Sequence, residues 1–87
     1  MFKVIFTQNA KKELGCLNKK EALIVLNKIY LLDFPFPQNL NIKKLAGFKY
    51  LFRLRINKSR VIFELDSEKK EVWIRKIGYR KDIYRFF

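Results

Sequence analysis

The stretch from residue 50 to residue 65 constrains the fold most, because apolar and polar side chains alternate along it with a period of two. Before a turn at residues 57–59, one side of the pattern holds Tyr50, Phe52, Leu54 and Ile56, and the other holds Leu51, Arg53 and Arg55. After the turn, Val61, Phe63 and Leu65 alternate with Arg60, Ile62 and Glu64. The pattern predicts two antiparallel strands joined by a short turn, with one apolar face and one largely cationic face.

A strand and two helices are predicted before this hairpin. Residues 2–6 (FKVIF) favour a strand, and residues 8–14 have helical composition, with Thr7 as the cap and Gly15 near the end. Asn18, with Glu21 three residues later, is typical of a capping box at the start of a second helix. Apolar residues recur in that helix as one buried stripe, made of Ala22, Val25, Leu26, Ile29 and Leu32.

The remaining segments complete one α+β domain over residues 1–87. Residues 33–41 are predicted to be a connecting loop, because Pro35 and Pro37 cannot continue a helix. Residues 71–77 (EVWIRKI) indicate another strand, whose inward face the pattern leaves open, and Gly78 is expected to end it. Residues 79–87 fit a short helix or an extended tail. We expect an N-terminal strand, a two-helix hairpin and a three-stranded antiparallel meander in one sheet, with the function on the face opposite the helices.

The chain has no histidine and one cysteine, Cys16. A single thiol cannot form an internal disulfide, so we expect a reducing cytoplasm, with Cys16 partly buried in the helical hairpin. These residue types cannot assemble a zinc site or a Cys/His or Ser/His nucleophilic pair, and we expect neither metal nor cofactor. The longest apolar stretch, residues 22–26, is far shorter than the roughly 20 residues that span a membrane, so we expect a soluble protein.

The charge is strongly positive, since 20 Lys and Arg against 8 Asp and Glu give a formal net charge of +12. Nucleic acid, an anionic membrane and an acidic protein would all be attracted. Residues 43–60 include no acidic residue, and their basic residues are Lys43, Lys44, Lys49, Arg53, Arg55, Lys58 and Arg60. Strand geometry places Arg53 and Arg55 on one face about 7 Å apart, close to the spacing of successive phosphates.

Arginine rather than lysine at positions 53, 55 and 60 favours bidentate contacts to phosphate or carboxylate. The alternative is a solvated face that only keeps the chain in solution. A second basic cluster, interrupted only by Asp82, consists of Arg75, Lys76, Arg80, Lys81 and Arg85, interleaved with Tyr79 and Tyr84. Rings beside guanidinium groups suit single-stranded RNA, although Tyr84 fits ordinary packing equally well and Trp73 fits the core or the sheet surface better than base stacking.

Four segments in this order resemble the RelE/ParE family of toxins from toxin–antitoxin systems: Lys44-Leu45 with Gly47, then YLFRLRINKSRVIF, EVWIRKI and GYRKDIY. The resemblance covers nearly the whole chain. It implies two helices packed on a twisted antiparallel sheet, similar to the fold of microbial ribonucleases. For the RelE branch it implies a ribosome-dependent mRNA endonuclease that blocks translation, in which the RNA 2′-hydroxyl attacks the adjacent phosphate without a metal.

The resemblance assigns catalytic roles to Arg53, Arg55, Arg60, Arg80 and Tyr84. Arg60 and Arg80 would stabilise charge on the phosphoryl oxygens, and Tyr84 would hold a base. Because arginine side chains stay protonated at working pH, Arg53 and Arg55 are poor general bases. Catalysis would then depend on positioning and charge, or on Tyr79, Tyr84 or Glu64 as substitutes. The expected RNA-binding residues are Lys43, Lys44, Lys49, Lys58, Arg75, Lys76, Tyr79, Lys81 and Arg85.

Two further functions stay open at this point. One is a ParE-like inhibitor of DNA gyrase, which shares the fold and needs no catalytic residues. The other is a nucleic-acid-binding module without catalysis. In either toxin branch we expect an acidic antitoxin as partner in a hetero-oligomer, because a charge of +12 favours rapid capture of an acidic, amphipathic chain.

Overall fold

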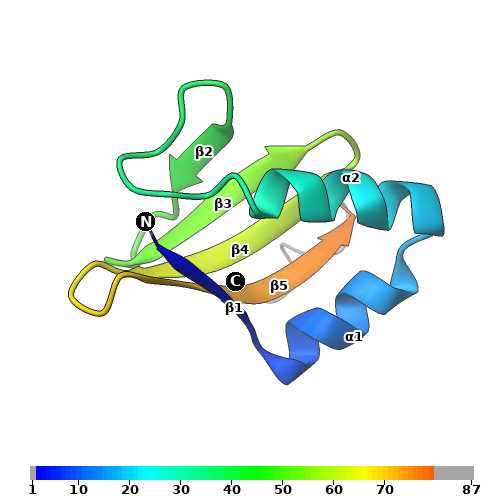
Figure 1. Ribbon diagram of the computed structural model, residues 1–87, viewed down its shortest axis with the longest axis horizontal. Coiled ribbons are helices and arrows are strands. Elements are labelled where there is room, and N and C mark those ends of the chain that lie inside the picture. Colours follow the sequence, from blue (N-terminus) through cyan, green and yellow to red (C-terminus); the bar gives the residue numbers. More distant parts are fainter. Residues whose placement is uncertain (1, 80–87) are drawn as a thin grey trace.

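The computed structural model describes residues 2–79, which form two helices and one mixed sheet (Figure 1). The elements in chain order are β1 (Lys3–Phe6), α1 (Gln8–Cys16), α2 (Lys19–Ile29), β2 (Asn41–Lys44), β3 (Leu51–Ile56), β4 (Ser59–Asp66) and β5 (Glu71–Tyr79). The predicted α+β class, with two helices and an antiparallel meander, is confirmed. Within residues 2–79, neither helix is long and apolar enough to cross a membrane.

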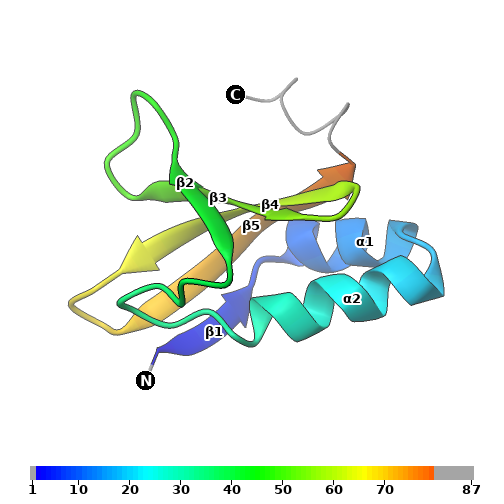
Figure 2. The ribbon, with the colours of Figure 1, turned by 90° about the horizontal axis from the view of Figure 1, so that it is seen from above.

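The sheet has the strand order β1-β5-β4-β3-β2. β3, β4 and β5 form the predicted antiparallel meander, and β1 adds to β5 in parallel. Both helices lie on the same side of this sheet, as Figure 2 shows from above. α1 packs on β5 and α2 reaches β3, so the pair covers one face of the meander. We call the opposite side of the sheet the outer face.

The sequence did not predict the strand β2. The loop predicted at residues 33–41 is one residue too long, because Asn41 is the first residue of β2. β2 pairs antiparallel with β3, with Ile42 opposite Leu54 and Lys43 opposite Arg53. Its four residues include a single apolar side chain, too few for an alternation to be recognised. Backbone pairing with β3, rather than its own hydrophobic pattern, defines this edge strand.

The helices begin where the sequence predicts and end elsewhere. Thr7 and Asn18 are the N-caps, and their side chains accept hydrogen bonds from the backbone N–H groups of Ala10 at 3.1 Å and Glu21 at 2.8 Å. α1 continues past Gly15 to Cys16, which is exposed rather than partly buried. α2 ends at Ile29, so the buried residue Leu32 belongs to the turn after the helix and not to the helix itself.

The core lies between the helices and the inner side of the meander. Val25 and Ile29 of α2 face Leu54, Phe63 and Ile74 of the sheet, and all five are fully buried. The loop after α2 contributes Phe36, whose ring lies edge-on to Phe52 and Phe63 with centroid distances of 5.1 and 5.8 Å. This loop is therefore packed against the core although it has no regular structure.

A bulge in β5 resolves which of its residues face inward. Phe63 pairs with Ile74 and Ile62 pairs with Lys76, so Arg75 is an extra residue in the ladder. Ile74 and Ile77 can both face the core because the bulge changes the phase of alternation between them. The strand also continues through Gly78 to Tyr79, so the predicted end at Gly78 is wrong.

Candidate nucleic-acid interface

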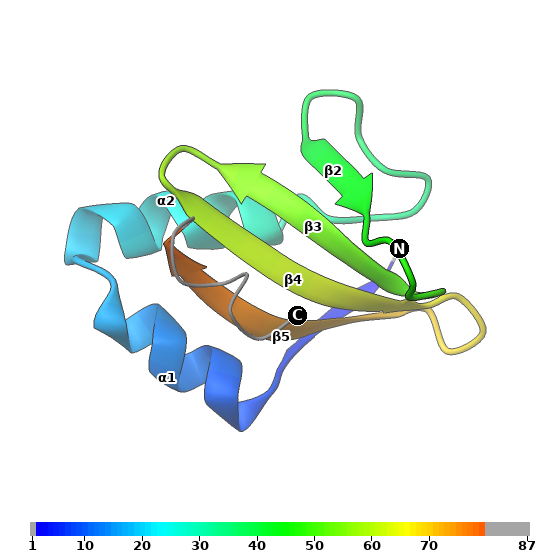
Figure 3. The ribbon, with the colours of Figure 1, turned by 180° about the vertical axis from the view of Figure 1, so that it is seen from behind.

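Two rows of cross-strand neighbours bring separate basic residues together on the outer face. The first row runs from β2 to β5 as Lys43, Arg53, Ile62 and Lys76. The second runs as Asn41, Arg55, Arg60 and Gly78. Directly paired residues of an antiparallel sheet project to the same side, so these side chains share one surface. Figure 3 views the molecule from this side, with α2 behind the sheet.

The basic side chains of the two rows differ in burial. Lys43 and Arg55 are exposed, Arg53 and Lys76 are half-buried, and Arg60 retains only 2% of its accessible surface. Next to them Ile62 is fully buried although it belongs to the outer face. The outer face therefore combines two exposed cations, Lys43 and Arg55, with a desolvated arginine, Arg60.

The Arg60 guanidinium is only partly hydrogen-bonded within residues 2–79. Its Nη1 donates to the Ser59 carbonyl oxygen at 3.2 Å, and its Nε makes no hydrogen bond within residues 2–79. Within the same residues, no carboxylate forms an ion pair with it. A buried charge without a counter-charge is costly. An anion held on the outer face would supply both the charge and the hydrogen-bond acceptors that Arg60 lacks.

A second unfavourable interaction lies beside it, because Arg55 and Arg60 are directly paired across β3 and β4. Like charges in that position destabilise a sheet. Phosphate oxygens can accept from two guanidinium groups at once, so a bound phosphate would convert this repulsion into an attraction. The geometry favours a phosphate-bearing ligand over a solvated surface.

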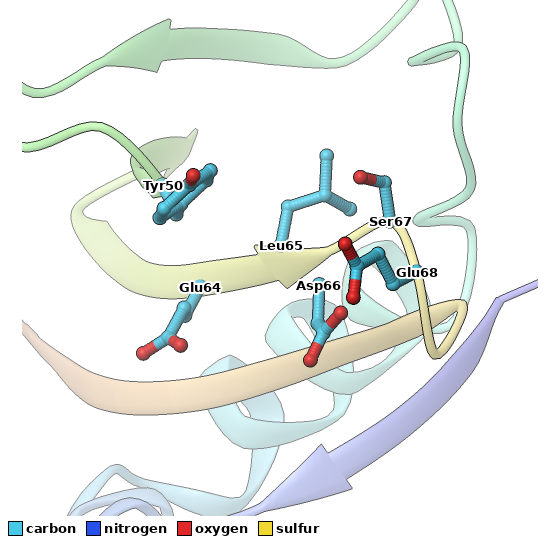
Figure 4. Close-up of a pocket in the computed structure, with 6 residues that line it drawn as sticks. All are labelled: Tyr50, Glu64, Leu65, Asp66, Ser67 and Glu68. Atoms are coloured by element: carbon cyan, nitrogen blue, oxygen red, sulfur yellow. The ribbon is translucent and has the colours of Figure 1, made fainter.

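The far end of the outer face carries the opposite charge. Glu64 lies opposite Trp73 and Asp66 lies opposite Glu71. Glu64, Asp66 and Glu68 line a pocket of about 300 Å³ beside Tyr50, and Figure 4 shows Glu64 and Asp66 projecting to the same side of β4. Within residues 2–79, no group of three or more His, Cys, Asp or Glu residues could hold a metal ion. This acidic end would repel a polyanion and confine it to the Arg55–Arg60 end.

Solved structures with the same arrangement are toxins and toxin–antitoxin complexes. A chain of the archaeal RelE–RelB complex from Pyrococcus horikoshii is 26% identical, with a TM-score of 0.76, and the match covers 93% of this chain and 97% of that chain. The RelBE2 complex from Mycobacterium tuberculosis matches at 21% identity and a TM-score of 0.75, over 91% and 98%. The isolated Escherichia coli RelE toxin matches at 20% identity and a TM-score of 0.74, and the match covers 99% of this chain and 94% of that chain. No protein-family model and no curated protein matches the chain.

The chain has the fold of the RelE toxins. The match to the archaeal complex extends over nearly all of both chains, and the matches at lower identity agree with it in fold.

The fold brings only part of the predicted site together on one surface. Arg53, Arg55, Arg60, Lys43 and Lys76 share the outer face. Lys44 and Tyr79 fall on the helix side, because they pair with Phe52 and Ser59. Lys49 and Lys58 are exposed in loops, and Lys58 belongs to the turn that joins Arg55 to Arg60. Arg80, Lys81, Tyr84 and Arg85 lie outside the described residues.

Two of the residues considered for the site, Arg75 and Glu64, contact each other. Arg75 Nη1 donates to Glu64 Oε1 at 3.1 Å, so this arginine is engaged by a carboxylate of the acidic end. The same contact occupies Glu64, which the sequence suggested as a substitute base. The pair is exposed, and its contribution to stability is small. Arg75 is therefore less available to an anionic ligand than the other basic residues of the outer face.

The sequence indicated Glu21 only as a helix-capping residue and did not indicate its contact with the β3–β4 hairpin. Within residues 2–79, only three polar or charged side chains are buried, and these are Glu21, Ser59 and Arg60. The capping-box spacing with Asn18 placed Glu21 at the start of α2, but no sequence signal linked it to the β3–β4 turn.

Proposed function

We propose that this protein is the toxin of a type II toxin–antitoxin system, acting in the cytoplasm as a ribosome-dependent mRNA endonuclease. The observation that carries the proposal is the desolvated Arg60 guanidinium, paired across the sheet with Arg55 and beside Arg53. Arginine groups arranged in this way suit the charge that develops on a phosphoryl group during transfer. The RelE and RelE–RelB structures among the matches support the same assignment.

The proposed reaction is an internal phosphoryl transfer. The RNA 2′-oxygen forms a bond to the adjacent phosphorus and loses its proton, while the bond to the 5′-oxygen breaks and that oxygen gains a proton. The products are a 2′,3′-cyclic phosphate and a free 5′-hydroxyl. Arg60 would bind the non-bridging oxygens, and Arg53 and Arg55 would hold the backbone of the strand. Since arginine stays protonated, these residues contribute charge and position rather than general base catalysis.

A translation assay with primer-extension mapping tests this function. We expect the pure protein to block translation and to cut mRNA only when ribosomes are present. The Arg53→Ala/Arg55→Ala variant should bind RNA about tenfold more weakly, and the slope of log affinity against log salt should fall by about 1.4, or 0.7 for each lost phosphate contact.

Lys11→Ala/Lys12→Ala is the matched control, because it removes the same charge from exposed positions of α1. A double arginine variant that inhibits as well as this control would show that the active face is wrongly assigned. Inhibition of gyrase supercoiling without RNA cleavage would select the ParE-like function instead.

The same proposal includes an acidic antitoxin as partner. Besides the net charge of +12, the chain exposes large apolar side chains on and after α2, namely Leu23, Tyr30, Leu31 and Phe34. These four are 48–65% exposed and would suit the apolar side of an amphipathic segment. The matched structures include antitoxin–toxin complexes of RelB with RelE, which supports an antitoxin partner for this chain.

We expect the complex with the antitoxin to be held by charge as well as by apolar contact. Raising the salt from about 0.1 M to 1 M shortens the screening length from about 10 Å to 3 Å. Association should therefore slow by tenfold or more, while dissociation changes less. Surface plasmon resonance at the two salt concentrations measures both rates, and salt-independent association would contradict electrostatic capture.

A further inference from the structure

Glu21 is a buried carboxylate that joins two parts of the fold. It lies in the first turn of α2 and keeps only 6% of its accessible surface. Its Oε1 accepts a hydrogen bond from Ser59 Oγ at 3.0 Å, and its Oε2 accepts one from Asn57 Nδ2 at 3.3 Å. These donors are 38 and 36 residues away in the chain. The side chain makes a tertiary contact instead of the reciprocal bond of a capping box.

Both donors lie at the tip of the β3–β4 hairpin, where Asn57 is in the turn and Ser59 is the first residue of β4. Asn57 has a positive φ of 51°, a left-handed conformation that asparagine tolerates better than most residues. Ser59 is fully buried and pairs with Ile56, closing the hairpin. Glu21 therefore ties the start of α2 to the tip of the hairpin.

The arginine pair is at this same end of the hairpin. Arg55 and Arg60 face each other one residue pair beyond Ile56 and Ser59. Ser59 is held from both sides, because its hydroxyl donates to Glu21 while its carbonyl oxygen accepts from Arg60 Nη1 at 3.2 Å. Strand alternation then requires Arg60 to face outward whenever Ser59 faces α2.

We infer that Glu21 is a positioning residue for the Arg55–Arg60 pair. Its carboxylate fixes the turn through two hydrogen bonds, and its negative charge behind the turn offsets the repulsion between the two guanidinium groups. The catalytic consequence of this role rests on the proposed ribonuclease function, whereas the positioning itself does not.

The chemistry of the contact favours a carboxylate over an amide. A carboxylate accepts from both Ser59 and Asn57, whereas the amide of glutamine has one acceptor oxygen and would present N–H groups to the other donor. Glu21→Gln should therefore lose the charge, and it can keep both contacts only if the bond to Ser59 reverses, with the glutamine N–H donating to Ser59 Oγ. Glu21→Ala should lose both bonds and the charge.

The control for general loss of stability is Val25→Ala. Val25 is fully buried one turn further along α2 and faces the core rather than the turn. Each variant is studied at a urea concentration chosen to give the same unfolded fraction. If Glu21→Ala does not fold, Glu21→Gln takes its place in both measurements.

The first measurement uses the free protein and NMR hydrogen exchange at the Arg60 Nε–H and the Ser59 and Arg60 amides. We expect Glu21→Ala to exchange at least tenfold faster at these groups than Val25→Ala, with Glu21→Gln between the parent and Glu21→Ala. Equal exchange in Glu21→Ala and Val25→Ala would overturn the inference.

The second measurement is mRNA cleavage on ribosomes. Displacement of an arginine by about 1 Å can cost about a hundredfold in rate, so we expect kcat to fall ten- to a hundredfold in Glu21→Ala with KM changed less than threefold. A kcat equal to that of Val25→Ala would also overturn the inference. If the parent does not cleave RNA, the proposed function fails, and the exchange measurement still decides the role of Glu21.

Discussion

Replacing Arg60 by glutamine is expected to lower the rate of mRNA cleavage by about 10²–10³, the loss typical of removing one preorganised donor to a developing oxyanion. Arg60 combines almost complete burial with a guanidinium whose Nε lacks a hydrogen-bond partner within residues 2–79. A group in that environment interacts strongly with an added anion, because little water screens it. Single-turnover cleavage with ribosomes in excess measures the chemical step directly.

Two further variants make this result specific. Arg60→Lys keeps the charge but loses the planar arrangement of N–H donors. We expect its cleavage rate to lie between those of the parent and Arg60→Gln. Arg75→Gln removes an arginine of the neighbouring strand that is already bonded to Glu64, and we expect it to change cleavage less than about twofold. Cleavage by Arg60→Gln at the parent rate would show that the phosphate binds elsewhere.

Truncation of Phe63 is expected to produce the largest loss of stability. Phe63 is fully buried, its ring stacks on Phe52 at a centroid distance of 5.6 Å, and Phe36 packs edge-on against it. Phe63→Ala should lower the free energy of unfolding by about 3–5 kcal/mol. For a domain of this size that corresponds to a fall in Tm of roughly 12 °C or more.

Urea denaturation followed by circular dichroism measures this loss. The control is Leu23→Ala, which removes an apolar side chain that is 54% exposed on α2, and we expect a change within about 0.5 kcal/mol. A loss below about 1 kcal/mol for Phe63→Ala would mean that the aromatic cluster of the loop does not contribute to the core as its packing indicates.

The sequence was sufficient to predict the β3–β4 hairpin that carries the arginines. Alternation from residue 50 to residue 65 indicated which side chains share a face within β3 and within β4. Each of these features depends on neighbours in the chain. Local patterns such as the N-caps Thr7 and Asn18 were recognisable for the same reason.

Features that depend on contacts between distant segments were not predictable. β2 has one apolar residue, so only its pairing with β3 reveals it and places Lys43 beside Arg53. The capping-box spacing located Glu21 correctly but gave no sign that its carboxylate reaches Asn57 and Ser59. The engagement of Arg75 by Glu64 likewise required the register of two strands.

Because Arg75 is an extra residue in the ladder, β5 can lose one residue at this position without a change in its pairing with β4. Without residue 75, the pairs Phe63 with Ile74 and Ile62 with Lys76 would follow one another in an unbroken ladder. Ile77 would still point toward the helices and Lys76 away from them. Homologues one residue shorter at this position would thus keep both their interior and their basic surface, and a gap placed there would align them correctly.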